Sequence, residues 1–390
     1  MIIALDGEPL VTQNISGIEQ HARNIVTELS TLPAHHQYVL VLNGAWETRR
    51  GFDTRFVEAL PPHFRQLWWS PPKTIREHIA QAMGAAPSSH PPADPQWGIF
   101  HSFSPGLPAL HGVCLSHTVH DMAYDLDPDV RRSAGAARLR RQMRSAIRRA
   151  ALTVAVSRQT AADVQALFQL PADRVLTIPN GINPVFMPLS DRELRQSLRE
   201  RYNLPRRYLL MVGSDIQRRN YRLVIDGITP LFSGEPALRL VFAGRQKWAD
   251  SNLFRRMAES GHLDRCVFIE APSDNELAQL YRDATITVCG SSFEGFGLSV
   301  LEATACGCPV ACSDMASLRE LAEDAVVYFA HDDPASMTEA ISSLLQDVDY
   351  RKLLISRGLK RATMFSWRSA ALRLLTGLET AAGRAKSGRE

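Results

Sequence analysis

Short apolar runs alternate with helical patterns along almost the whole chain. Continuous apolar runs are typical of parallel strands that are buried on both faces, and parallel strands need crossover connections, usually helices. The alternation therefore predicts an α/β protein with doubly wound parallel sheets. The predicted strands are Ile2–Asp6, Tyr38–Leu42, Gly98–Ser102, Val113–Val119, Leu152–Val156 and Val175–Ile178 in a first group, and Tyr208–Val212, Leu238–Ala243, Val267–Ile269, Ile286–Cys289, Pro309–Cys312 and Ala325–Tyr328 in a second.

A segment with several prolines separates the two groups of strands. It follows Gly181 and passes Pro184, Pro188 and Pro205. The chain has 390 residues, 45% of them hydrophobic, which is enough for two globular domains with buried cores. We therefore predict Rossmann-like domains over residues 1–184 and 185–365. Such domains bind ligands at the carboxyl ends of their strands, which are expected to face each other across a cleft.

The segment around residue 294 combines a strand, a turn with glycines and an apolar helix. Glu294, Gly295, Phe296 and Gly297 form the turn, and the helix begins at Leu298. The first N–H groups of a helix have no partner within the helix, and they carry partial positive charge. The segment therefore predicts a binding site for phosphate or another anion.

Two glutamates flank this helix start. Glu294 and Glu302 are the only charged residues between Asp283 and Asp314. A carboxylate on an apolar helix needs a polar partner, because burying it unpaired is costly. A helix cap or a buried salt bridge is one explanation. We favour hydrogen bonds from sugar hydroxyls to both glutamates, because an ionised carboxylate accepts several such bonds.

Two adjacent arginines follow the first strand of the second group. That strand leads into Gly213, and the loop after it carries Arg218, Arg219 and Asn220. Arginine offers a fixed fork of donors and a permanent charge, which suit a diphosphate. An exposed loop pair is the alternative. The diphosphate reading is favoured because this loop and the Glu294 turn are expected at the same end of one sheet.

In the first group of strands, His120 directly follows Val113–Val119. An isolated histidine is by default a structural residue, but the carboxyl end of a parallel strand is where ligands bind. We therefore expect His120 to bind a sugar hydroxyl or to steady the reacting centre. Gly17 stands at a predicted helix start, where the missing side chain allows the backbone to approach a diphosphate closely.

Charge is concentrated in one stretch. The net charge is only +3, yet residues 131–149 contain eight arginines and no acid. Leu139, Met143 and Ile147 recur at helical spacing, which predicts an amphipathic basic helix over Arg131–Arg149. A solvated face and a face that binds anionic lipid headgroups or a lipid-linked phosphate fit equally well. Nucleic acid is a weaker option, because no aromatic residue lies among the arginines.

The cysteines and the start of the chain bear on the compartment. The six cysteines lie mostly within apolar segments, where cysteine acts as a small hydrophobe, so we expect a reducing cytosol. The one-residue gap between Cys306 and Cys308 is unlike the spacing of metal sites and favours packing. The chain lacks a signal peptide's basic flank and any apolar window long enough to span a membrane. A cytoplasmic protein is expected, with peripheral contact to the inner membrane as an option.

Several motifs, in this order, resemble the family 4 retaining glycosyltransferases, which have the two-Rossmann GT-B fold. The resemblance covers nearly the whole chain. The motifs are Ser16-Gly-Ile18, His120-Asp121, Val156-Ser157, Ile178-Pro-Asn-Gly-Ile182, Val212-Gly213, Arg218-Arg-Asn220, Gly244 to Trp248, Glu294-Gly-Phe-Gly-Leu298, Ala305-Cys-Gly-Cys-Pro-Val310 and Phe365-Ser-Trp367. The resemblance implies an N-terminal acceptor domain, a C-terminal donor domain, and a crossover helix with a frayed tail over residues 366–390.

The resemblance also implies roles for the site residues. Glu294 and the backbone of Gly295, Phe296, Gly297 and Leu298 would hold the donor sugar, and Glu302 would hold the nucleotide ribose. Arg218 and Arg219, in the loop with Gly213 and Asn220, would neutralise the diphosphate leaving group, and no metal or other cofactor is expected. The chain departs from the family pattern at three positions, where Arg219 replaces lysine and where Gly290 and Ser299 replace proline.

The implied reaction transfers a hexose, with retention, from a nucleotide-diphosphate sugar to a hydroxyl of a growing, lipid-linked surface polysaccharide. The arginine loop and the Gly-x-x-Lys-Trp segment resemble those of bacterial mannosyl- and rhamnosyltransferases. GDP-mannose is therefore the first expected donor and a dTDP-sugar the second. Two alternatives stay open: a nucleotide-sugar epimerase on the same double fold, which needs no acceptor, and a non-catalytic nucleotide-sugar-binding protein.

Overall fold

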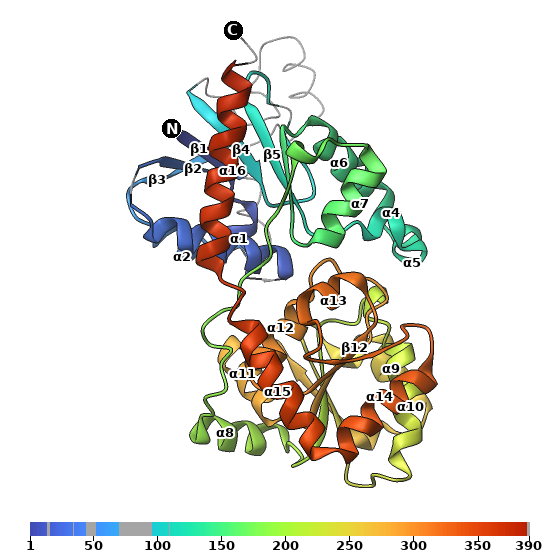
Figure 1. The fold of residues 1–390 in the computed structure, drawn as a ribbon. Helices are drawn as coiled ribbons and strands as arrows, with labels where there is room; N and C mark the ends of the chain where they lie inside the picture. Colours follow the sequence, from blue (N-terminus) through green and yellow to red (C-terminus); the bar gives the residue numbers. More distant parts are fainter. Residues whose placement is uncertain (14–15, 34, 44–51, 70–95, 109, 388–390) are drawn as a thin grey trace. The chain divides into compact units, whose positions relative to one another are not determined.

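The computed structural model describes residues 1–13, 16–33, 35–43, 52–69, 96–108 and 110–387. The chain divides into two compact units, one of Met1–Tyr124, Ala134–Gly181 and Trp367–Glu390, and one of Asp125–Ser133 and Ile182–Ser366. We call them unit 1 and unit 2. For comparison, the sequence predicts boundaries after residues 184 and 365. Each unit contains one parallel sheet (Figure 1), so the predicted doubly wound α/β architecture is confirmed.

Unit 1 is built on a seven-stranded sheet in the order β3-β2-β1-β4-β5-β6-β7. Its strands are β1 (Ile2–Asp6), β2 (Gln37–Asn43), β3 (Phe64–Trp69), β4 (Trp97–Ser102), β5 (Cys114–Val119), β6 (Leu152–Ala155) and β7 (Val175–Thr177). Six of them lie within one residue of the predicted ends. The edge strand β3 was not predicted, because Arg65 and Gln66 interrupt its apolar pattern and an edge strand tolerates such polar residues.

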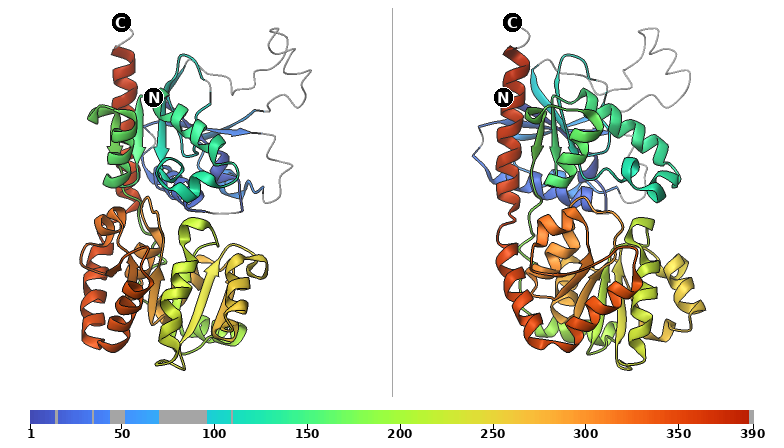
Figure 2. Two further views of the ribbon diagram at one scale, coloured as in Figure 1. Left: turned by 90° about the vertical axis from the view of Figure 1, so that its right-hand side faces the viewer. Right: turned by 45° about the vertical axis from the view of Figure 1, so that its right-hand side comes forward.

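Helices from both ends of the chain pack in unit 1. Its helices are α1 (Gly17–Thr31), α2 (Arg55–Glu58), α4 (Ala123–Leu126), α6 (Ala136–Arg149), α7 (Arg158–Phe168) and α16 (Trp367–Ser387), of which α4 extends into the segment that clusters with unit 2. The C-terminal helix α16 runs along α1 and contacts β4, β5 and β6 (Figures 1 and 2). The sequence also predicts a frayed tail after Glu379, and this prediction is wrong as far as Ser387, because α16 continues to Ser387 and Ala381 and Ala382 are buried.

The basic stretch forms two helices, so the prediction of one helix over Arg131–Arg149 is wrong at its start. α5 (Pro128–Arg132) ends before Ser133, and α6 begins at Ala136. Between them Gly135 has a left-handed φ of 80°, a conformation that interrupts a right-handed helix and that glycine adopts without strain. Within α6 the predicted amphipathic pattern holds, since Met143 and Ile147 are buried.

Unit 2 is built on a six-stranded parallel sheet in the order β10-β9-β8-β11-β12-β13. Its strands are β8 (Tyr208–Val212), β9 (Arg239–Gly244), β10 (Cys266–Glu270), β11 (Ile286–Cys289), β12 (Val310–Ser313) and β13 (Val327–Phe329). The main helices are α8 (Arg192–Tyr202), α9 (Tyr221–Ile228), α10 (Asn252–Glu259), α11 (Asp274–Asp283), α12 (Leu298–Ala305), α13 (Ala316–Ala322), α14 (Pro334–Gln346) and α15 (Val348–Ala362). Figure 1 shows α9, α10 and α14 on one side of the sheet and α11, α12 and α15 on the other.

The strand order of unit 2 places two loops side by side. Strands β9 and β10 lie on one side of β8, and β11 to β13 lie on the other. Ligands of doubly wound sheets bind at such a reversal, at the carboxyl ends of the two central strands. The loop after β8 carries Arg218 and Arg219, and the turn after β11 carries Glu294. Ser292 N–H donates to the Arg218 carbonyl at 2.8 Å, which links the two loops directly.

Candidate active site

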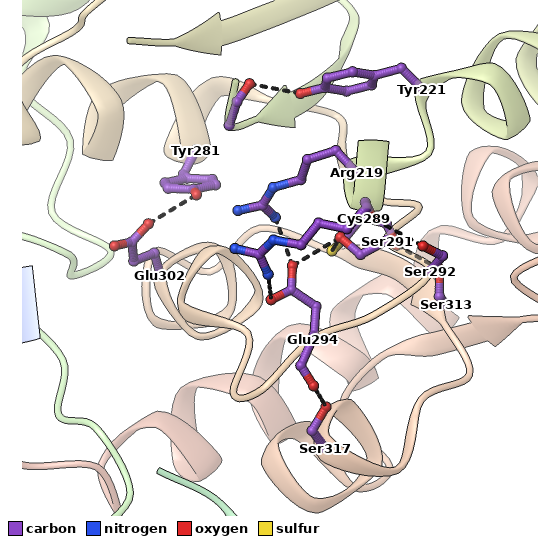
Figure 3. A network of polar contacts seen from close by, with 12 residues as sticks. Arg219, Tyr221, Tyr281, Cys289, Ser291, Ser292, Glu294, Glu302, Ser313 and Ser317 are labelled. Carbon is purple, nitrogen blue, oxygen red and sulfur yellow. Dashed lines mark hydrogen bonds and ion pairs between the residues drawn. The ribbon is translucent and has the colours of Figure 1, made fainter. Parts of the chain in front are cut away.

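Glu294 is the centre of a buried ion-pair network in unit 2 (Figure 3). Its side chain is 8% exposed, and its Oε1 lies 2.9 Å from Arg219 Nη1. Its Oε2 lies 3.4 Å from Arg218 Nη1. Ser291 Oγ donates to Oε1 at 2.9 Å from within the same turn. The structure therefore brings together the three charged residues that the sequence assigns to sugar and diphosphate.

The network sets the charge state of Glu294. Burial alone would raise the pKa of this carboxyl, but Arg219 and Arg218, helped by the Ser291 hydroxyl, lower it below its ordinary value. The pKa of Arg219 is raised above its ordinary value by Glu294, against the opposing effect of burial. Glu294 is therefore ionised at neutral pH, and because arginine carries a permanent charge, the cluster has one net positive charge for an anionic ligand.

Gly213 makes room for Arg219. A Cβ at this position would lie 2.8 Å from Arg219 Nε, and Gly213 has a φ of 124°, which L side chains rarely adopt. Arg219 Nε is buried, and no hydrogen-bond partner for it occurs in the part of the chain that the structure describes. The Arg219 guanidinium therefore keeps a buried N–H donor near the carboxyl end of β8.

The turn between β11 and α12 is held from behind. Ser317 Oγ, on α13, donates to the Glu294 carbonyl at 2.5 Å. Gly297 caps α12 with a left-handed φ of 100°, and a side chain there would collide with Leu318. Gly295 and Phe296 precede it, and the Phe296 ring packs edge-on against Phe365 at 5.8 Å. Leu298 then begins α12, whose first N–H groups lie one short turn from Glu294.

Glu302 lies one turn into α12 and is 5% exposed. Its Oε2 accepts a hydrogen bond of 3.1 Å from the hydroxyl of Tyr281, a fully buried residue on α11 (Figure 3). The site residues predicted from the sequence do not include Tyr281, Ser291 or Ser317. No spacing links Tyr281 to Glu302, because their contact arises from the packing of α11 on α12. Ser291 could have been found as a hydroxyl three residues before Glu294.

Asn220 is tied to the fold. It has a left-handed φ of 52° at the start of α9, which asparagine tolerates better than most residues. Its side-chain amide donates to the His331 carbonyl at 2.9 Å. The structure therefore gives the Asn220 side chain a backbone partner outside the Glu294 network, and the predicted role in donor binding remains a prediction.

In unit 1, His120 follows β5 and packs against α1. Its Nε2 lies 3.1 Å from the Phe103 carbonyl, and because a carbonyl only accepts, this nitrogen carries the proton. The other ring nitrogen, Nδ1, is then an acceptor. The His120 ring lies 5.0 Å from the ring of His21 on α1, four residues after Gly17. The structure thus places His120 beside the helix that Gly17 begins.

His120 belongs to a group of buried or largely buried histidines that was not predicted from the sequence: His21, His101, His117 and His120. Burial lowers the pKa of His120 and of His101 well below the ordinary value, and neighbouring histidines add to this. Burial also lowers the pKa of His21 and of His117 to about 4, against the opposing effect of hydrogen bonds with Asn180 and the Ser104 carbonyl. The group is therefore neutral at pH 7, so it can exchange hydrogen bonds but adds no positive charge.

Neither a cluster of metal ligands nor a membrane-spanning helix occurs among the described residues. Nowhere in the described ranges do three His, Cys, Asp or Glu side chains come together as metal ligands would. All six cysteines are free thiols, and burial raises the pKa of Cys306 and of Cys308 to about 12. None of the helices that the structure describes combines the length and the apolar character needed to cross a bilayer.

Each half of the chain matches a known family of glycosyltransferases. The family model described as Glycosyltransferase Family 4 matches residues 15–186, and the one described as Glycosyl transferases group 1 matches residues 194–361. The O-antigen chain mannosyltransferase B of Escherichia coli is 30% identical over 254 residues, which are 64% of this chain and 66% of that protein. A serotype-specific mannosyltransferase WbdA of Escherichia coli is also 30% identical over 254 residues, but the match spans only 31% of its length.

A solved structure supports the fold. The crystal structure of WaaG, a glycosyltransferase involved in lipopolysaccharide biosynthesis, superimposes with a TM-score of 0.67 at 17% identity, covering 98% of each chain. At this identity the likeness concerns the fold alone. The two family models, taken together, match most of the chain from residue 15 to residue 361, and the chain therefore belongs to the glycosyltransferases that they describe.

Proposed function

We propose that this chain is a retaining hexosyltransferase that uses a nucleotide-diphosphate sugar. The observation that carries the proposal is the buried cluster of Glu294, Arg218 and Arg219, one short turn before the N-terminus of α12. A cluster with one carboxylate and two guanidiniums matches a ligand that joins sugar hydroxyls to a diphosphate. Sugar hydroxyls donate to the carboxylate, and the diphosphate oxygens accept from the arginines and the helix N–H groups.

In the proposed reaction the bond between the anomeric carbon and the β-phosphate oxygen breaks while the acceptor oxygen bonds to that carbon. Negative charge grows on the β-phosphate, where Arg218, Arg219 and the start of α12 stabilise it. The acceptor hydroxyl gives its proton to the leaving diphosphate. The two arginines supply the charge that a metal ion supplies elsewhere, so we propose a reaction without a metal or other cofactor.

GDP-mannose is the proposed donor, with a dTDP-sugar as the second choice. The support comes from the two relatives described above, both of which are mannosyltransferases of Escherichia coli. The acceptor would be a hydroxyl of a growing, lipid-linked surface glycan, in keeping with the O-antigen assignment of the first relative. His120 would then offer its Nδ1 as acceptor to a donor-sugar hydroxyl.

A lipid-linked acceptor would place the enzyme at a membrane surface, and α6 offers the surface for it. Four exposed arginines lie on one face of this helix, and no carboxylate among the described residues forms an ion pair with them: Arg138, Arg141, Arg148 and Arg149. Side chains of α6 also line an open hollow in the surface, namely Arg141, Arg144, Ser145, Arg148 and Arg149. The apolar side chains of α6 face the core. We therefore propose a peripheral contact with anionic lipid headgroups, without insertion.

The free thiols support the cytosol as the compartment of the proposed enzyme.

Thermal-shift measurements with GDP, UDP, dTDP and ADP and their sugar conjugates test the donor proposal. A ligand that binds the folded chain raises its unfolding temperature. The proposal predicts a selective shift with GDP and GDP-mannose. A shift confined to another nucleotide would show that GDP-mannose is not the donor. Conversion of the donor's hexose into another hexose without any acceptor would show that the chain is an epimerase and not a transferase.

A further inference from the structure

The hydrogen bond between Tyr281 and Glu302 is buried on both sides. Tyr281 is fully buried on α11, Glu302 is 5% exposed on α12, and the Oη to Oε2 distance is 3.1 Å (Figure 3). Burial, followed by the charge of Glu302, raises the pKa of Tyr281 well above its ordinary value. The phenol is therefore neutral at working pH and donates its proton to the carboxylate. A charge-assisted bond of this kind in a buried place is strongly directional.

The position of the phenol is itself fixed. The Tyr281 ring contacts the Phe186 ring edge-on, with ring centres 6.1 Å apart. The next residue, Arg282, donates to the carbonyls of Val185 and Met187 at 2.6 and 2.7 Å. The end of α11 is thus anchored to the segment around Phe186. This anchoring limits the movement of the Tyr281 hydroxyl, and its hydrogen bond favours one rotamer of the Glu302 carboxylate.

A fixed carboxylate suits a vicinal diol. The two oxygens of an ionised carboxylate offer about four acceptor sites in all, so the bond from Tyr281 is compatible with further hydrogen bonds to the same carboxylate. A ribose presents two neighbouring hydroxyls, which pair best with a carboxylate whose plane is fixed. We propose that Tyr281 is a positioning residue that orients Glu302 toward the ribose of a GDP donor and so makes the site prefer ribonucleotides to deoxyribonucleotides, which disfavours the dTDP-sugar named as the second choice of donor. This inference rests on the proposed function, in which Glu302 holds the nucleotide ribose.

The test measures the dissociation constants of GDP, 2′-deoxy-GDP and 3′-deoxy-GDP for the full chain by calorimetry. The wild type is expected to prefer GDP by about tenfold or more, the range for a hydrogen bond to a charged group. The Tyr281→Phe variant should bind GDP more weakly and lose most of the preference, leaving about threefold or less. A general loss of stability would weaken all three ligands alike and leave their ratio unchanged.

Tyr208→Phe is the matched control. Tyr208 is equally buried in unit 2, and its hydroxyl donates to the Leu280 carbonyl at 2.8 Å, so the substitution removes a similar bond that does not reach Glu302. It should keep the wild-type ratio. In a Glu302→Gln background, Tyr281→Phe should change the ratio no further, because the orienting bond then has no charged acceptor to hold.

The outcomes separate this inference from the function it rests on. Wild-type discrimination that survives in Tyr281→Phe, or that is lost equally in Tyr208→Phe, would overturn the positioning role alone. A wild type that binds GDP but shows no preference would overturn the ribose role of Glu302 and this inference with it. Acceptor-dependent hexose transfer is measured separately, and its absence would overturn the proposed function whatever the nucleotide ratios are.

Discussion

Arg219 Nη1 lies 2.9 Å from Glu294 Oε1, so a residue assigned to the diphosphate holds the residue assigned to the sugar. Arg218 contacts the other oxygen of the same carboxylate. A diphosphate that binds these guanidiniums competes with Glu294 for them. The two roles are therefore coupled through charge, and substitutions in the cluster should affect nucleotide binding and transfer differently.

Glu294→Gln should abolish most transfer while nucleotide affinity stays equal or increases. The substitution removes the sugar's carboxylate acceptor but also removes the negative charge that competes with the diphosphate. We expect transfer to fall by about a hundredfold or more, as for the loss of an interaction made in the transition state, with GDP bound as tightly as before or several-fold more tightly. Calorimetry and initial rates measure the two effects. Equal losses in binding and rate would contradict the assigned role.

Arg219→Gln should shift the acid limb of the pH–rate profile upward. In the wild type, Arg219 and Arg218 hold the pKa of Glu294 below its ordinary value against burial. Without Arg219, burial dominates and the pKa rises, so the carboxylate protonates at higher pH and transfer fails earlier on acidification. Arg222→Gln, an exposed change on α9, is the control. An unshifted profile in the Arg219→Gln variant would show that Arg219 does not set this pKa.

Gly297→Ala should distort the site turn. The side chain would be strained at a φ of 100° and would collide with Leu318. We expect a loss of about 1–3 kcal/mol in the free energy of unfolding, the range for strained backbone positions, and a larger proportional loss of transfer. Gly234→Ala, where a Cβ meets nothing within 4 Å, serves as control. Thermal or urea unfolding that is identical for both variants would argue against the turn geometry.

The buried histidines of unit 1 should make folding stability depend on pH. Burial lowers the pKa of His21 and of His117 to about 4 in the folded chain, below the unfolded value of 6.5. The stabilisation from the neutral rings is therefore complete above about pH 6.5 and is lost as the pH falls toward 4. We expect a loss of about 2 kcal/mol per histidine between about pH 7.5 and pH 5, from the linkage relation. Urea unfolding of the wild type and of a His117→Gln variant measures it. A wild-type stability that does not change over this range would refute the prediction.

The exposed arginines of α6 should bind anionic vesicles. Substituting Arg138, Arg141, Arg148 and Arg149 by glutamine should weaken binding to phosphatidylglycerol vesicles at low ionic strength by about tenfold or more, since each basic residue near such a surface contributes about 1 kcal/mol. Binding should also weaken as salt rises. A matched variant replaces four exposed arginines of unit 2 by glutamine: Arg192, Arg206, Arg255 and Arg256. An equal weakening of vesicle binding in both variants would contradict a specific role of α6 in membrane contact.

The sequence was sufficient to predict the fold because the apolar strands are continuous and buried. Strands such as β1 and β11 show this pattern clearly, and their predicted ends are those of the structure. Strand β3 lies at the sheet edge, where polar residues are tolerated, and so it carried no signal. The break at Gly135 was equally hidden, because helical spacing of apolar residues continues across short interruptions.

The charged part of the candidate site could be predicted because strand-end positions follow from the topology. Arg218 and Glu294 each follow a central strand, and the strand order joins them. Tyr281 could not be predicted, since its contact with Glu302 depends on how two helices pack side by side. The histidine pair of His21 and His120 was missed for the same reason, because one residue lies on α1 and the other follows β5.

The most direct test of the central claim is the release of nucleoside diphosphate from GDP-mannose, measured with and without a lipid-linked glycan acceptor and in the presence of a metal chelator. The account predicts release that depends on the acceptor, persists in the chelator, and leaves mannose attached to the glycan with its anomeric configuration retained. The account would be contradicted if the chain binds a nucleotide but releases no nucleoside diphosphate in an acceptor-dependent manner, either from GDP-mannose or from the sugar conjugates of UDP, dTDP and ADP.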